Sequence, residues 1–103
     1  MLNKLQRGTQ SSVTATHATA AVATRDAVAG RTHCAVAVSV SSDKATSILL
    51  IKDGTTTIWQ QQVGAGQANL IFPGGLTATA GALLSAEIDG TAACKANLSV
   101  ITI

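Results

Sequence analysis

The sequence predicts an all-β protein, a small antiparallel β-sandwich of about seven to eight strands with an extended N-terminal arm. The first observation is composition: Thr, Val and Ile abound, Gly punctuates the chain, and charged residues make up only 12%. The second is a period-two alternation of apolar and polar residues in several segments. The third is a turn signal roughly every 8–12 residues. At 103 residues the chain is one domain, and jelly-roll-like and immunoglobulin-like topologies both fit.

The N-terminal third is the least regular part. Residues 1–12 show no periodicity and are expected to form an extended arm, and residues 13–24 alternate weakly, as an edge strand does. Residues 25–31 form a connection in which Gly30 accepts a positive φ. We therefore divide the chain into an arm with an edge strand, residues 1–30, and a β-sandwich, residues 31–103.

The middle of the chain predicts three strands. In "THCAVAVSV" the residues Cys34, Val36, Val38 and Val40 share one face, which indicates a strand with one buried face. The segment "ATSILLIK" is apolar on both faces, as in a central strand covered on both sides. Asp53-Gly54 signals a type I′ hairpin turn. In the return strand Thr57, Trp59, Gln61 and Val63 point one way, and Ile58, Gln60 and Gln62 the other.

The C-terminal third predicts further strands. "ANLIF" is a strand that Pro73-Gly74-Gly75 ends, because proline donates no ladder hydrogen bond. "ALLSAEID" alternates and is expected to be a strand, with Asp89-Gly90 as a second hairpin signal. The last strand directs inward the residues Cys94, Ala96, Leu98, Val100 and Thr102. Its outward residues Ile101 and Ile103 are apolar and require a cover.

Charge is distributed unevenly. Residues 1–31 carry Lys4, Arg7, Arg25 and Arg31 against Asp26, a balance of +3, whereas the remainder sums to −1. A basic segment meets acidic surfaces. No aromatic residue lies in it to stack on bases, so we expect an acidic protein surface as its partner and no nucleic acid.

Compartment is inferred from what the sequence lacks. It contains no run of eighteen apolar residues, so no membrane partner is expected. The start "MLNKLQRGTQSS" lacks the apolar core of a signal peptide, so the protein is expected to remain in the cytoplasm where it is made, unless it is carried in an assembly. Cys34 and Cys94 are expected to be buried thiols, although the sequence leaves a bridge between them open.

Motifs for catalysis are missing, so we expect no enzyme, no cofactor and no metal. His17 and His33 are the only histidines and form no zinc-type spacing. His33 and Cys34 are neighbours on a strand, so their side chains diverge. Glu87 and Asp89 share an outward face about 7 Å apart, but no aromatic platform for a sugar accompanies them. "GAGQAN" and "FPGGL" are turns rather than phosphate loops.

Trp59 is the remaining candidate, either an interface anchor or a core residue. The uncharged Gln and Thr residues around it suit permanent subunit contacts. The predicted interface residues are Lys4, Arg7, Arg25, Trp59, Ile101 and Ile103.

Three segments resemble small virion proteins encoded among the head genes of tailed bacteriophages. They are "SDKATSILLIKDGTTTIWQ", "ANLIFPGGLTATAGALLSAEI" and the terminal "KANLSVITI". In that group a strand ending in Lys-Asp-Gly-Thr leads to a Trp-containing partner strand, then to a Phe-Pro-Gly-Gly-Leu turn and an alternating final strand. The resemblance covers the part of the chain from Val36 to the C-terminus and leaves the N-terminal third outside it.

The resemblance implies a structural protein of the bacteriophage virion. It would be a capsid decoration or cement protein, a homotrimer bound to the major capsid protein on the outer surface of the head. It would be made in the host cytoplasm, and it would stabilise the shell. Two alternatives remain open at this stage: a tail, baseplate or head-fibre component, and a carbohydrate-binding β-sandwich module.

Overall fold

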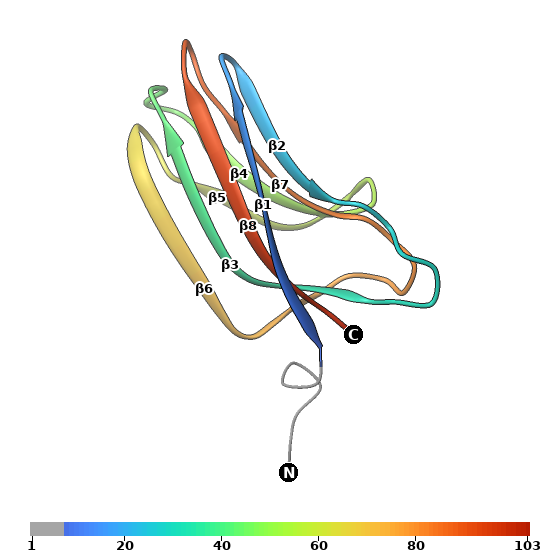
Figure 1. Cartoon of the computed structure of the whole chain (residues 1–103). Helices are drawn as coiled ribbons and strands as arrows, with labels where there is room; N and C mark the ends of the chain where they lie inside the picture. The colour runs from blue at the N-terminus through green and yellow to red at the C-terminus, as the bar shows by residue number, and fades with distance from the viewer. Residues whose placement is uncertain (1–7) are drawn as a thin grey trace.

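The computed structural model describes residues 8–103 as eight antiparallel strands in two packed sheets (Figure 1). This confirms the predicted β-sandwich. The strands are β1 (Thr9–His17), β2 (Ala20–Arg25), β3 (His33–Ser42), β4 (Ile48–Asp53), β5 (Thr56–Gln62), β6 (Gly66–Thr77), β7 (Leu84–Asp89) and β8 (Cys94–Thr102). No helix long and apolar enough to span a bilayer occurs among these residues.

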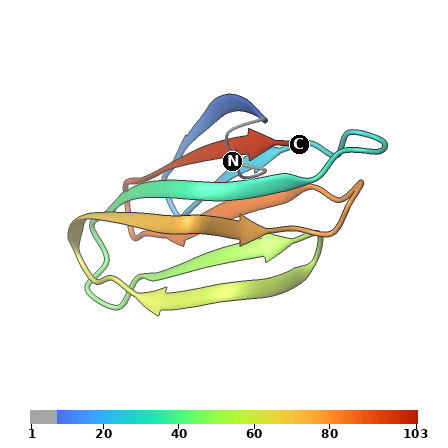
Figure 2. The same ribbon diagram turned by 90° about the horizontal axis from the view of Figure 1, so that it is seen from below.

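The topology is that of a jelly roll. One sheet has the order β1-β8-β3-β6 and the other β2-β7-β4-β5. Every connection crosses from one sheet to the other except the β4–β5 hairpin, so the chain winds as two interleaved Greek keys. The choice between jelly-roll and immunoglobulin-like topologies, which the sequence left open, is thereby made. Figure 2 shows β5 and β6 at one side of the sandwich and β1 and β2 at the other.

The core lies between the inner faces of the two sheets and is built from small and branched aliphatic residues. Its largest fully buried apolar side chains are Leu49, Ile51, Leu84, Ile88, Leu98, Val38 and Val100. On β8 the residues Cys94, Ala96, Leu98 and Val100 are all buried, as the alternation predicted. The two cysteines are free, because Cys34 pairs with Ile101 and Cys94 with Ser42, at opposite ends of β8.

The N-terminal segment is more ordered than expected. Residues 9–25 do not form an arm and a lone edge strand but two strands, β1 and β2, one in each sheet. β1 pairs with β8 along its whole length, and β2 contributes the buried Ala21 and Ala23 to the core. Small side chains weaken the alternation without preventing pairing, which explains the wrong prediction. Of the predicted arm, residues 1–7 lie outside the described part of the chain.

A bulge in β3 changes the expected inward set. The pairing register of β3 shifts between Ala35 and Ala37, so Ala35 is buried whereas Val36 is only half-buried. We predicted that Pro73-Gly74-Gly75 ends the strand, and this was wrong: opposite the bulge these residues form an excursion within β6, which continues to Thr77. Gly74 and Gly75 have φ of 91° and 79°, which only glycine adopts readily.

The β4–β5 hairpin also departs from prediction in detail. Its loop residues are Gly54 and Thr55, between the paired Asp53 and Thr56, and of the two only Gly54 has a positive φ. That pattern belongs to a type II′ turn and not to type I′. A second register shift opposite Ile51 places both Ile58 and Trp59 against that residue, so Ile58 packs on the core and does not point outward. The outer face of β4 is uncovered, with Ile48 36% exposed.

Asp89-Gly90 is not a hairpin turn, because β7 and β8 lie in different sheets. The crossing loop is held by Asp43, whose carboxylate accepts hydrogen bonds from the backbone N–H groups of Thr91 and Ala92, both at 2.8 Å. The Thr91 N–H bond is the principal cause of the lowered pKa of Asp43.

Candidate interaction surfaces

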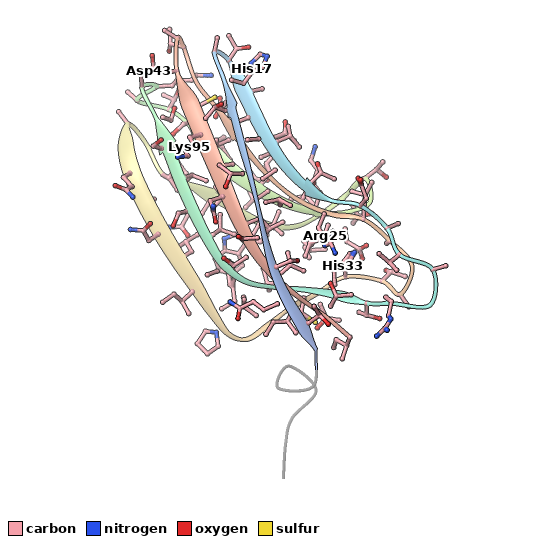
Figure 3. All side chains as sticks on the ribbon, in the orientation of Figure 1. His17, Arg25, His33, Asp43 and Lys95 are labelled. Carbon is pink, nitrogen blue, oxygen red and sulfur yellow. The ribbon has the colours of Figure 1, made fainter. Side chains whose placement is uncertain are left out.

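The predicted interface residues do not gather in one place. Lys4 and Arg7 lie outside the described residues. Arg25 is half-buried at the end of β2, and its Nε is buried without a hydrogen-bond partner among residues 8–103 (Figure 3). It is therefore anchored in the sandwich and does not extend from a free arm.

Ile101 and Ile103 obtain at least part of their cover from their own chain. Ile101 packs so closely against Gly8 that a Cβ added to Gly8 would collide with the Cγ2 atom of Ile101. Ile103 exchanges two backbone hydrogen bonds with Thr32, at 2.8 and 2.9 Å. Both isoleucines are half-buried.

Trp59 combines the two roles that the sequence left open. It faces inward beside Ile51 and makes an edge contact with Phe72 of β6, with ring centroids 5.2 Å apart. It nevertheless remains 36% exposed, because β5 is the last strand of its sheet. Trp59 therefore packs on the inner face and reaches solvent at the same time.

β5 and β6 together form one side of the sandwich, which contains Trp59. We name this surface the open side. Both strands are terminal in their sheets, so each has one edge without a strand partner among residues 8–103. The half-buried apolar residues packed against the core here are Ile58, Val63, Leu70, Phe72 and Leu76. Ile71, on the outer face of β6, is 79% exposed. At the opposite side of the sandwich, β1 and β2 contact each other across the two sheets (Figure 2).

The open side carries no charge at all. Between Asp53 and Glu87 the sequence contains no Asp, Glu, Lys or Arg, and this stretch includes all of β5 and β6. We did not single out this interval from the sequence. The absence of charged residues can be read from the sequence, and it is unusual for terminal strands, which charged residues usually protect. Only the topology, however, identifies β5 and β6 as terminal.

His33 is fully buried and saturated with hydrogen bonds. Its Nε2 lies 2.8 Å from the carbonyl oxygen of Asp26, which can only accept, so Nε2 carries a proton. Its Nδ1 lies 2.7 Å from Thr102 Oγ1. Cys34 has a different neighbour, Thr77 Oγ1 at 3.5 Å. The two side chains thus diverge, as predicted, and no group of three metal-binding side chains occurs in residues 8–103.

Glu87 and Asp89 are held in ion pairs on the outer face of β7. Glu87 lies 3.0 Å from Lys52, and Asp89 lies 2.7 Å from Lys44. Asp89 also accepts the backbone N–H of Ile48 at 2.8 Å. The hydrogen bond from Lys44, followed by that of Ile48, lowers the pKa of Asp89 below its ordinary value of 3.8.

We expect Asp89 to make the fold sensitive to acid. Because its pKa is lower in the folded state, its contribution is fully present above the unfolded pKa near 3.8 and is lost as pH falls through the folded pKa. Asp89→Asn should lower the free energy of unfolding by less than about 1 kcal/mol at neutral pH, since the pair is partly exposed, and this deficit should shrink below pH ~4. Urea titrations at pH 7 and pH 3 measure both values. Lys44→Met should reproduce the effect in part; a deficit equal at both pH values would contradict it.

Comparisons with known proteins establish the fold and no family. No family model and no curated protein matches the sequence. Among solved structures, a Bacillus endospore appendage pilus protein is 15% identical, with 91% of this chain and 84% of that chain covered and a TM-score of 0.55. The CBM36-1 domain of a xylanase from the hindgut metagenome of Trinervitermes trinervoides is 11% identical, with coverages of 91% and 95% and a TM-score of 0.46. The Aeromonas hydrophila inhibitor PliG is 13% identical, with coverages of 99% and 93% and a TM-score of 0.44. The pilus protein shares the β-sandwich fold.

Proposed function

We propose that this chain is a non-enzymatic structural protein of a bacteriophage virion, a decoration or cement protein that self-associates through its open side and binds the outer surface of the head. The observation that carries the proposal is the open side itself, which combines two unpaired strand edges, half-exposed apolar residues and a complete lack of charge. The resemblance of residues 36–103 to phage head proteins supplies the virion as the setting.

A second copy of the chain is the partner that fits the open side best. Unpaired edges bind other strands unless charge, proline or a bulge prevents it. Neither edge carries a charge, and the interruptions are local: the pairing of β6 is regular from Gly66 to Ile71, before Pro73, and that of β5 is regular from Trp59 to Gln62. Trp59 is the type of residue that anchors protein interfaces. An uncharged surface also avoids repulsion between identical copies, which a charged surface would suffer.

The geometry of the open side supports a closed ring. Because β5 and β6 lie on the same side but belong to different sheets, one copy can offer β5 to one neighbour and β6 to the other. Such a head-to-tail contact closes into a cyclic oligomer when the rotation between copies is correct. The homotrimer expected from the resemblance is the smallest ring of this kind.

Light scattering after size exclusion measures this directly. We expect the protein to have about three times the 10.3 kDa chain mass. Gln61→Lys, which places a charge on the exposed part of β5, should give a monomer with little change in the melting of the fold. Ala27→Lys, in the exposed β2–β3 connection, is the matched control and should remain trimeric. A monomeric wild-type protein would overturn self-association.

Attachment to the head requires a separate measurement. Antibodies against the chain, applied to purified phage particles produced by the cells that encode it, should label the head surface in electron micrographs. Labelling of tails or baseplates would favour the alternative of a tail component. Particles that contain none of this protein by mass spectrometry would rule out a virion role.

A further inference from the structure

The outer face of the β1-β8-β3-β6 sheet is a grid of neutral hydrogen-bonding side chains. Pairing across the four strands places Thr16, Lys95, Ser41 and Gln67 in one row. The next row on the same face consists of Thr14, Asn97, Ser39 and Asn69. Neighbouring strands lie about 4.8 Å apart, and successive rows about 7 Å. Seven of these eight positions hold hydroxyl or amide groups, and the eighth is Lys95, which carries the single charge (Figure 3).

Two adjoining hollows are formed on this grid. One, of about 420 Å³, is lined by side chains of both rows, including Ser39, Gln67 and Asn97. The other, of about 600 Å³, extends from the row of Lys95 to the loops at the end of the sheet, where Asp43 lies. Ser41 and Lys95 line both hollows, so together they form one groove, which we name the polar groove. Both hollows are shallow and open to solvent.

The second row is already oriented by hydrogen bonds within it. Asn97 Nδ2 donates to Thr14 Oγ1 at 2.6 Å, so the Asn97 carbonyl oxygen is left as an acceptor. Ser39 Oγ donates to Asn69 Oδ1 at 2.7 Å, so the Asn69 amide N–H₂ is left as a donor. The row therefore presents an acceptor on β8 and a donor on β6, separated by β3, which match two different hydroxyl groups of one larger ligand.

Lys95 is distinguished from the other described lysines by its lack of an acidic partner. Lys44 and Lys52 are paired with Asp89 and Glu87, whereas no carboxylate lies within ion-pair distance of Lys95 among residues 8–103. Asp43 shares one hollow with Lys95, but both of its oxygens already accept backbone N–H groups. The ammonium of Lys95 thus has its donors available for a ligand in the polar groove.

From this arrangement we infer that the polar groove binds an acidic saccharide, with the sugar hydroxyls on the Asn97–Asn69 row and a carboxylate beside Lys95. A sugar carries several hydroxyls, so one can donate to the Asn97 oxygen while another accepts from the Asn69 amide. A carboxylate accepts a charge-assisted hydrogen bond from the ammonium. The sugar would provide a binding function in addition to the structural one proposed above, and it does not depend on that proposal.

Other ligand classes fit the polar groove less well. Nucleic acid requires several cations and stacking aromatics, and the grid offers one cation and no aromatic side chain. A protein partner suits the outer face of the other sheet better, where Val22 is 43% exposed and Ile48 36%, beside the ion pairs of Glu87 and Asp89. A purely accepting anion such as sulfate would leave the Asn97 oxygen unpaired.

The test is a nuclear magnetic resonance titration of the full chain with short fragments of alginate, polygalacturonate and hyaluronate, together with neutral cellohexaose. We expect at least one acidic fragment to shift the side-chain amide signals of Gln67, Asn69 and Asn97. The side-chain amides of Gln60, Gln61 and Gln62 on β5 are internal controls and should not move. Lys95→Gln should weaken binding roughly tenfold, the effect of one charge-assisted hydrogen bond, and Lys95→Arg should largely restore it.

The polar groove is exposed, so these lysine variants should fold like the wild-type protein, which the unperturbed signals of the core will verify. The inference is overturned if no acidic fragment moves the three amides, or if the glutamines of β5 move equally. Binding of cellohexaose as tight as that of the acidic fragments would overturn the assignment of an acidic sugar. An unchanged affinity of Lys95→Gln would do the same.

Discussion

Removal of residues 1–18 is expected to abolish folding, whereas removal of residues 1–7 should leave a sandwich that melts cooperatively. The longer deletion eliminates β1, which pairs with β8 from Thr9 to His17. It exposes the edge of β8 and uncovers the core beside Val13 and Ala15. A ladder of this length, at about 1 kcal/mol per hydrogen bond, is comparable with the roughly 5–15 kcal/mol that stabilises a domain of this size.

Circular dichroism melts and amide spectra of the two truncated proteins measure this difference. The shorter deletion is the control, because it ends before the first strand and retains Gly8 against Ile101. A dispersed spectrum and a cooperative melt of the longer deletion would show that β1 is dispensable. That result would favour the predicted division into an arm with an edge strand, residues 1–30, and a β-sandwich, residues 31–103.

The regular strands could be predicted from the sequence because their burial is one-sided. β8 is the clearest case: Cys94, Ala96, Leu98 and Val100 alternate with polar residues, and the structure buries these four. Prediction failed where one extra residue changes the phase of the alternation. The bulges near Val36 and Ile58 each place a residue on an unexpected face, and a bulge leaves no reliable mark in a single strand.

The surfaces were harder to predict than the strands, because they depend on which strands are neighbours. The polar groove unites residues of β1, β3, β6 and β8, and no sequence spacing relates Asn69 to Asn97. The open side likewise exists only because β5 and β6 are both terminal strands. Alternation indicates which face a residue occupies, but strand order decides what lies beside it.

His33→Ala is expected to destabilise the fold by about 3–5 kcal/mol, among the largest effects of any single substitution. The ring is fully buried and connects three segments: β3, the Asp26 carbonyl before it, and Thr102 near the C-terminus. Alanine would leave a cavity and deprive the Asp26 oxygen of its donor. Urea denaturation gives the change in the free energy of unfolding directly.

Two further variants separate the hydrogen bonds of His33 from its packing. Thr102→Val retains a similar volume but removes one partner of the ring, so it should cost only about 1 kcal/mol. His17→Ala, at an exposed histidine whose Nδ1 accepts the backbone N–H groups of Thr19 and Ala20, should also cost far less than His33→Ala. If His33→Ala and His17→Ala were equally mild, the region around His33 would have to be much looser than its burial indicates. In that case the closure of the sandwich near Thr102 would depend chiefly on the backbone pairing of Thr32 with Ile103.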